Sequence, residues 1–136
     1  MPIHIMAVDD EANTVNFLRL LIELEQPEWI FHGALDGDQA LEIAANAPVD
    51  FVLLDISMPG MDGIEVCRRL RTLPGAAGML IVMLTALDTP QRRQLSKEAG
   101  ADGFWVKPFK TALIAKEIDR MIQGRAAQQL KSSLER

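Results

Sequence analysis

The chain has 136 residues, of which 49% are hydrophobic and 24% are charged, and its net charge at pH 7 is -5. This composition is typical of one globular domain with a single core, and it excludes disordered and collagen-like proteins. The negative charge argues against direct binding to nucleic acid, because no overall basic surface is expected. With only Cys67, no long apolar run and no signal peptide, the sequence predicts a cytoplasmic protein without an internal disulfide or a membrane contact.

Short apolar runs alternate with amphipathic segments along the chain. The runs, each about as long as a buried strand, are residues 3–8, 29–34, 51–54, 79–84 and 104–106. The amphipathic segments, which predict helices, are residues 15–22, 40–44, 64–70, 95–99 and 113–122. Gly124 is expected to cap the last helix. Because parallel strands need helical crossovers, this alternation predicts a parallel sheet with helices on both faces.

Polar residues stand directly after four of the five runs. Asp9 and Asp10 follow the first run, Asp55 the third, Thr85 the fourth and Lys107 the fifth. Such sheets bind ligands at the carboxyl ends of their strands, so these side chains are expected at one edge. Three crowded acids favour a bound cation, and oxygen ligands favour Mg²⁺. With a lysine and a hydroxyl able to stabilise a transferring phosphoryl group, Asp55 is the expected nucleophile.

Four motifs together resemble the receiver domain of two-component response regulators. They are VDDE at residues 8–11, LLDISMPGMDG at 53–63, LTA at 84–86 and GADGFWVKPF at 100–109. The resemblance implies an α/β, flavodoxin-like, doubly wound fold, whose five-stranded parallel sheet has the order 2-1-3-4-5 and is accompanied by five helices. It implies a receiver domain over residues 1–123, and residues 124–136 are expected to be a polar tail or the start of a linker helix.

The resemblance also implies a role for each residue of the acidic cluster. Asp55 would accept a phosphoryl group from a histidine kinase or a histidine phosphotransfer protein. Mg²⁺ would be bound by Asp10, Asp55 and the backbone carbonyl of Ser57, with Asp9 acting through water. The phosphorylated protein would then control a partner.

A switch and a charge partner follow from the same resemblance. Lys107 would pair with the phosphoryl oxygens, and its peptide bond to Pro108 would be cis. The phosphoryl group would attract the hydroxyl of Thr85, and Phe104 would turn into the space that this movement vacates. The result would be a population shift that changes the surface of the fourth helix, fifth strand and fifth helix.

Two positions are expected to set the lifetime of the phosphoryl group. Ser57 and Leu87 stand two residues after Asp55 and Thr85, and in the family these positions neighbour the path of the hydrolytic water. Leu87 cannot orient water, so we expect slower self-dephosphorylation than a Leu87→Glu variant would show.

Other polar residues have simpler interpretations. His4 and His32 lie in strand-like segments without metal partners and are expected to be satisfied histidines. The charges on the last two helices and the loop between them form either a solvated face or the surface of a homodimer or a target complex. They are Arg92, Arg93, Lys97, Glu98, Asp102, Lys116 and Asp119.

The output of such a receiver has three interpretations. The favoured one is a stand-alone receiver that acts by protein contact and catalyses only its own phosphoryl transfer and autodephosphorylation. The second is the excised first domain of a regulator with a DNA-binding or enzymatic output, whose linker helix begins at Gln123. The third is an aspartyl-phosphate phosphatase or hydrolase. Those enzymes carry a second aspartate two residues after the nucleophile, where this chain has Ser57.

Overall fold

A computed structural model of the chain describes residues 1–108 and 111–134. Its strands are β1 (His4–Val8), β2 (Ile30–Ala34), β3 (Phe51–Asp55), β4 (Leu80–Thr85) and β5 (Gly103–Val106). All neighbouring strands are parallel, and their order is β2-β1-β3-β4-β5. The predicted sheet order is therefore confirmed.

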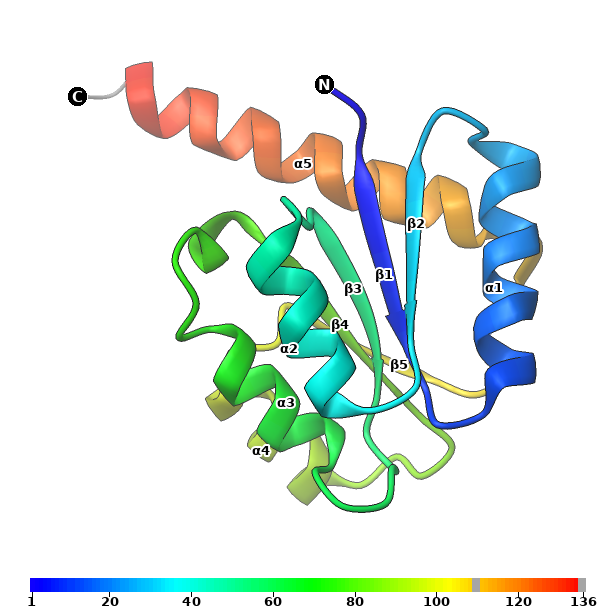
Figure 1. The fold of residues 1–136 in the computed structure, drawn as a ribbon. Coiled ribbons are helices and arrows are strands. Elements are labelled where there is room, and N and C mark those ends of the chain that lie inside the picture. Colours follow the sequence, from blue (N-terminus) through cyan, green and yellow to red (C-terminus); the bar gives the residue numbers. More distant parts are fainter. Residues whose placement is uncertain (109–110, 135–136) are drawn as a thin grey trace.

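Five helices cover the two faces of the sheet (Figure 1). They are α1 (Ala12–Glu25), α2 (Gly37–Asn46), α3 (Gly63–Leu70), α4 (Pro90–Ala99) and α5 (Ile114–Leu134), with short 3-10 turns η1 (Ala76–Gly78) and η2 (Thr111–Leu113). Helices α1 and α5 pack together on one face, whereas α2, α3 and α4 form the other layer. This is the doubly wound arrangement that the sequence predicts.

The central strand β3 shows why an aspartate can be buried at its end. Side chains of β3 alternate between the two cores, so that Val52 and Leu54 face α2 and α3 while Phe51 and Leu53 face α1 and α5. Every residue of β3 is buried, as expected for a central parallel strand covered on both faces. Asp55 is the last of them, and it is only 6% exposed.

Helix ends fix the two loops that follow β3 and β4. The side chain of Asp62 caps α3 by accepting a hydrogen bond from the backbone N–H of Glu65. The side chain of Thr89 caps α4 by accepting one from the backbone N–H of Arg92. Gly100 ends α4 with a φ of 102°, a left-handed conformation that favours glycine. The cap at Thr89 therefore places Arg92 in the first turn of α4, directly after the loop that leaves β4.

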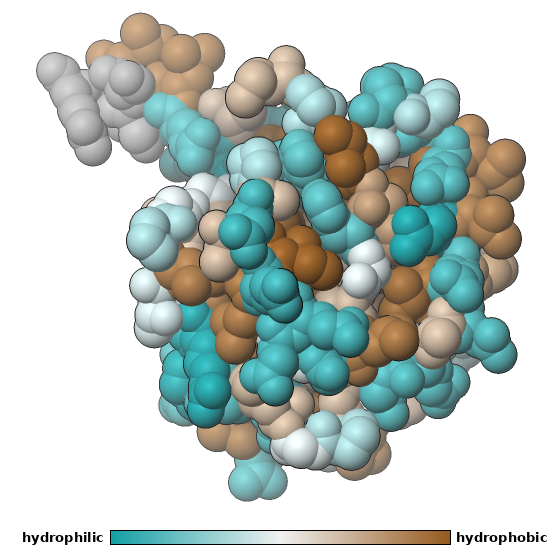
Figure 2. Space-filling model, in the orientation of Figure 1, coloured by the Kyte–Doolittle hydropathy of each residue, from teal (hydrophilic) through white to brown (hydrophobic). Residues whose placement is uncertain are grey.

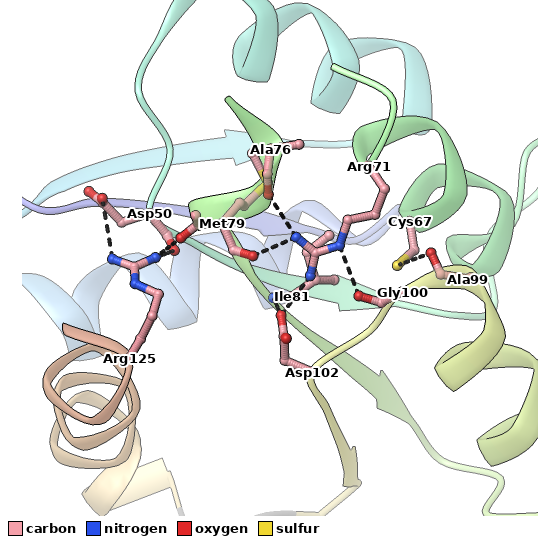
Figure 3. Close-up of polar contacts among 11 residues, drawn as sticks. Asp50, Cys67, Arg71, Ala76, Met79, Ile81, Ala99, Gly100, Asp102 and Arg125 are labelled. Atoms are coloured by element: carbon pink, nitrogen blue, oxygen red, sulfur yellow. Dashed lines mark hydrogen bonds and ion pairs between the residues drawn. The ribbon is translucent and has the colours of Figure 1, made fainter. Parts of the chain in front are cut away.

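Arg71 ties the end of α3 to the start of β5 (Figure 3). Its guanidinium donates to the carbonyl oxygens of Ala76, Met79 and Gly100 at 2.6–2.9 Å and pairs with Asp102 at 2.6 Å. The same carboxylate accepts from the backbone N–H of Ile81 at 2.9 Å. Asp102, which the sequence assigned to a charged surface, thus has partners within the fold.

The expectation that Gly124 ends the last helix is wrong. Helix α5 continues through Gly124 to Leu134, and its last turns project beyond the sheet (Figure 1). The next residue, Arg125, donates to the carbonyl oxygen of Asp50 at 3.2 Å and to that of Gly78 (Figure 3). These tertiary contacts hold the helix past a glycine whose intrinsic helix propensity is low.

Several large apolar side chains lie on the surface rather than in the core. Figure 2 shows that some of them lie along the edge of the molecule formed by α1, and others lie elsewhere on the surface. On that helix, Phe17, Leu20 and Leu24 are 49%, 59% and 80% exposed, while the opposite face packs on the sheet. Nowhere in residues 1–108 and 111–134 is a helix long and apolar enough to cross a membrane.

Candidate functional site

Three aspartates meet at the carboxyl edge of the sheet. Asp9 and Asp10 follow β1, Asp55 ends β3, and the two strands are neighbours with Val8 opposite Leu54. One carboxylate oxygen from each aspartate lies within 4.8 Å of the others. Asp9 and Asp55 are buried, whereas Asp10 is exposed. The arrangement brings three acids around one point that solvent can reach.

Lys107 supplies a positive charge to this cluster. It follows β5, and its backbone N–H donates to the carbonyl oxygen of Thr85 at 2.7 Å, which fixes where its side chain starts. Its Nζ lies 3.4 Å from Oδ2 of Asp9 and 3.6 Å from Oδ1 of Asp55. The other oxygen of Asp9 accepts from the backbone N–H of Glu11 at 2.9 Å. Both oxygens of Asp9 are thus engaged within the protein.

The pKa of Asp55 reflects its burial and the charges around it. Burial, which removes water from the carboxylate, raises this pKa to about 6. Lys107 and a hydrogen bond from the backbone N–H of Ser57 lower it, while the charges of Asp9 and Asp10 raise it. A divalent cation would offset both the burial and the repulsion. The oxygen-only donors and their spacing fit Mg²⁺.

The loop after β3 is packed tightly onto the strand end. A Cβ added to Gly63 would lie 2.2 Å from the carbonyl oxygen of Asp55 and 2.8 Å from Cα of Ile56, so only glycine fits there. The backbone N–H of Gly63 donates to the carbonyl oxygen of Ile56 at 2.9 Å. Gly60, with a φ of 76°, makes the turn between them. The turn therefore fixes the position of Ser57 relative to Asp55.

The hydroxyl of Thr85 is engaged by the loop that follows it. Thr85 ends β4 and is 1% exposed. Its Oγ1 donates to the carbonyl oxygen of Leu87 at 3.1 Å and accepts from the backbone N–H of the same residue at 3.0 Å. A further bond comes from Arg92, whose Nη1 donates to Oγ1 at 3.0 Å. In this arrangement, the hydroxyl is bonded to the β4–α4 segment.

Arg92 is the site residue that the sequence reasoning missed. The same Nη1 donates to Oγ of Ser57 at 3.3 Å, so one nitrogen contacts hydroxyls from both loops beside Asp55. The sequence places Arg92 only among the charges of a helix surface. A cation seven residues after Thr85 has no recognisable local pattern, and only the capped first turn of α4 directs it back to the site.

The remaining predicted residues lie along β5, at its end and in the loop after β4. Phe104 is partly buried, and the guanidinium of Arg93 lies 4.7 Å from the centre of its ring. The peptide bond between Lys107 and Pro108 is cis. Leu87 is 55% exposed.

His4 and His32 are partners of each other. Nδ1 of His4 and Nε2 of His32 are 2.9 Å apart, and the rings stack with centroids 5.2 Å apart. Burial and the nearby His4 and Arg19 lower the pKa of His32. Both histidines are thus satisfied side chains, in agreement with the sequence interpretation.

The sequence is similar to that of a large group of signalling proteins. Residues 5–119 match the family described as the response regulator receiver domain. The transcriptional regulatory protein ResD of Bacillus subtilis (strain 168) is 38% identical over 124 residues, which are 91% of this chain and 49% of that protein. Response regulator PleD of Caulobacter vibrioides is 38% identical over 84% of this chain and 25% of its own length. The chain spans about half of the first relative and a quarter of the second.

Solved structures share the fold over nearly the whole chain. The chemotaxis protein CheY4 of Vibrio cholerae superposes with a TM-score of 0.80 at 30% identity, covering 88% of this chain and 98% of that one. A CheY-like receiver domain protein from Methanospirillum hungatei JF-1 superposes with a TM-score of 0.85 and covers 94% and 99%. At 23% identity, the second likeness supports the fold alone.

Proposed function

The chain belongs to the response regulator receiver domain family, and we propose that its Asp55 accepts a phosphoryl group from a histidine kinase or a histidine phosphotransfer protein. The chain is a receiver domain of two-component response regulators. The observation that carries the proposal is the position of Asp55: a nearly buried carboxylate at a strand end, with Lys107 at 3.6 Å and two more acids beside it.

The transfer reaction uses the carboxylate as a nucleophile. An oxygen of Asp55 attacks the phosphorus of a phosphohistidine, forming an O–P bond as the N–P bond breaks. The electron pair of the broken bond stays on the imidazole nitrogen, which leaves with the donor protein. Lys107 stabilises the charge on the phosphoryl oxygens, because its ammonium group already lies between Asp9 and Asp55.

Four residues would hold a magnesium ion. We assign Asp10, Asp55 and the backbone carbonyl of Ser57 as its ligands. Asp9 would act through water, in keeping with the engagement of both its oxygens by Glu11 and Lys107. When bound, Mg²⁺ supplies positive charge that neutralises the acids and the incoming phosphoryl oxygens.

The switch rests on Thr85 and Phe104. For the hydroxyl of Thr85 to reach a phosphoryl oxygen, it must exchange its present bonds to Leu87 and Arg92. Phe104 then turns inward, and this packing change alters the surface of α4, β5 and α5. Phosphorylation needs to shift such an equilibrium by only a few kcal/mol. The altered surface contacts a downstream protein, an output domain or a second copy of the chain.

The wider setting is also a proposal. We place the protein in the cytoplasm, where it acts through a partner or as the receiver of a longer regulator, and assign it no enzymatic activity beyond its own phosphoryl transfer and hydrolysis. A phosphatase or hydrolase is not favoured, because Ser57 stands where such enzymes place a second acid and its hydroxyl contacts Arg92.

Intact-mass spectrometry with acetyl phosphate and Mg²⁺ tests the proposal. The wild type should gain one phosphoryl group, and the gain should disappear with a chelator or in Asp55→Asn. Asp38→Asn, which removes an exposed acid from the first turn of α2, is the matched control and should behave as wild type. A wild type that stays unmodified with acetyl phosphate and with a phosphohistidine donor would contradict the proposed function.

A further inference from the structure

We propose that Arg92 is a second cation of the phosphoryl site, which leaves the hydroxyls of Ser57 and Thr85 to pair with an oxygen of phosphorylated Asp55. The inference rests on the proposed function, since it concerns the same aspartate. Its starting point is the guanidinium nitrogen that lies 3.3 Å from Oγ of Ser57 and 3.0 Å from Oγ1 of Thr85.

Both hydroxyls that Arg92 contacts belong to residues near Asp55. Ser57 stands two residues after Asp55 in the loop that leaves β3, so that Arg92 contacts a residue of the loop that begins at the acceptor. Thr85 ends the strand next to β3, where Leu84 is the register partner of Asp55. Arg92 is partly buried against these loops rather than extended into solvent. Its charge therefore lies beside the position that the phosphoryl group would occupy.

The side-chain contacts of Arg92 are with hydroxyls rather than with carboxylates. Among residues 1–108 and 111–134, no carboxylate lies within ion-pair distance of its guanidinium, whereas the adjacent Arg93 pairs with Asp88 at 2.6 Å. Two hydroxyl acceptors satisfy its hydrogen-bonding but do not neutralise it. A phosphoryl oxygen would be a stronger acceptor for a guanidinium, because the bond would join opposite charges.

The charge balance of the site favours a second cation. Lys107 together with one bound divalent cation would offset the three aspartates, so the acidic cluster would be balanced before phosphorylation. An acyl phosphate replaces one carboxylate charge with about two negative charges, so one further charge has to be stabilised. Arg92 is positioned to supply this stabilisation at short range.

The surroundings of Arg92 leave room for the movement. A groove of about 370 Å³ lies between the loop after β3 and the start of α4, lined by Ile56, Ile64, Leu87 and Arg92 among others. As the guanidinium turns to the phosphoryl group, it releases Oγ1 of Thr85. Arg92 thus couples charge stabilisation to the release of the switch hydroxyl.

The test separates the charge of Arg92 from its hydrogen bonds. Arg92→Lys keeps the charge, Arg92→Gln keeps a donor for the two hydroxyls without the charge, and Arg92→Ala keeps neither. The readout is the dissociation constant of beryllofluoride, a phosphoryl mimic, measured with saturating Mg²⁺ by fluorine NMR. Arg69→Ala is the matched control, since Arg69 is an exposed cation whose ion pair is with Glu65 of the same helix.

We expect Arg92→Gln and Arg92→Ala to weaken beryllofluoride binding by roughly tenfold and Arg92→Lys to stay close to wild type, as a charge-assisted bond predicts. If Arg92→Gln binds beryllofluoride as tightly as wild type, the inference is wrong, because a neutral hydrogen-bond donor at this position would then be sufficient. The proposed function is checked separately by the phosphorylation of wild-type Asp55 in intact-mass spectrometry. If wild type is phosphorylated and the three variants bind beryllofluoride equally well, the inference alone fails.

Discussion

The ammonium group of Lys107, which follows β5, lies 3.6 Å from Oδ1 of Asp55 at the end of β3. It is the charge that holds the pKa of Asp55 down against burial and against the two neighbouring acids. Without it, burial and the charges of Asp9 and Asp10 would raise this pKa further. The contact between these two residues thus favours an ionised acceptor near neutral pH.

Replacing Lys107 by methionine should raise the pKa of Asp55 above its value of about 6. The substitution keeps most of the side-chain volume and removes the positive charge that favours the carboxylate. A pH titration of the carboxyl carbon of Asp55 by NMR, without divalent cations, measures the effect. Lys97→Met, on the exposed last turn of α4, is the control, and an unchanged pKa in Lys107→Met would refute the electrostatic role.

Asp55→Asn should stabilise the fold at neutral pH in the presence of a chelator. The folded pKa is raised from 3.8 to about 6, so the native state binds more protons than the unfolded state between these values. The free energy of unfolding of the wild type therefore falls as pH rises through this window. At about pH 7.5, the variant should be more stable by about 2 kcal/mol, and at about pH 4 the difference should largely vanish.

Urea denaturation at several pH values measures this difference. His32 titrates in both proteins, so the difference between their unfolding free energies at each pH reports the contribution of Asp55. A gain in stability that is the same at acidic and neutral pH would contradict the raised pKa. Added Mg²⁺ should stabilise the wild type more than Asp55→Asn, because a ligand that binds only the native state raises its stability.

Gly63→Ala should destabilise the protein by about 1–3 kcal/mol, because the added methyl group would overlap the backbone of Asp55 and Ile56. Gly124→Ala is the matched control, since nothing lies within 4 Å of the added Cβ in the middle of α5. It should stabilise by about 0.5–1 kcal/mol, because alanine favours a helix more than glycine does. Equal effects of the two substitutions in thermal denaturation would disprove the tight approach at Gly63.

Leu87→Glu should shorten the lifetime of the phosphorylated protein. Leu87 is exposed and stands two residues after Thr85, and a carboxylate there could accept a proton from an attacking water. We expect hydrolysis to accelerate on the order of tenfold, below the range for an evolved general base. Loss of the mass increment with time measures the rate. Leu95→Glu adds an exposed acid on α4 as the control, and an equal or slower decay of Leu87→Glu would count against the role of this position.

The sequence predicts the fold well because its signals are local. Apolar runs such as residues 51–54 identify buried strands, and polar residues after them mark the edge where parallel strands end. The structure therefore brings Asp9, Asp10 and Asp55 together with Lys107, as the chain order implies.

Two features depend on tertiary contacts that no local pattern encodes. Gly124 resembles a helix end, but the bonds of Arg125 to the backbone of Asp50 and Gly78 keep α5 helical beyond it. Arg92 resembles a surface charge, and only the path of the chain between β4 and α4 turns it towards Ser57. In both cases, the decisive partner is distant in sequence.

Reduction of the phosphorylated aspartate with borohydride tests the central claim most directly. Borohydride reduces an aspartyl phosphate to homoserine, so peptide mass spectrometry of the phosphorylated and reduced protein identifies the acceptor residue. Our account predicts homoserine at position 55 and nowhere else, and only when Mg²⁺ was present during phosphorylation. Homoserine at position 9 or 10, or a phosphoryl group that borohydride does not convert, would contradict it.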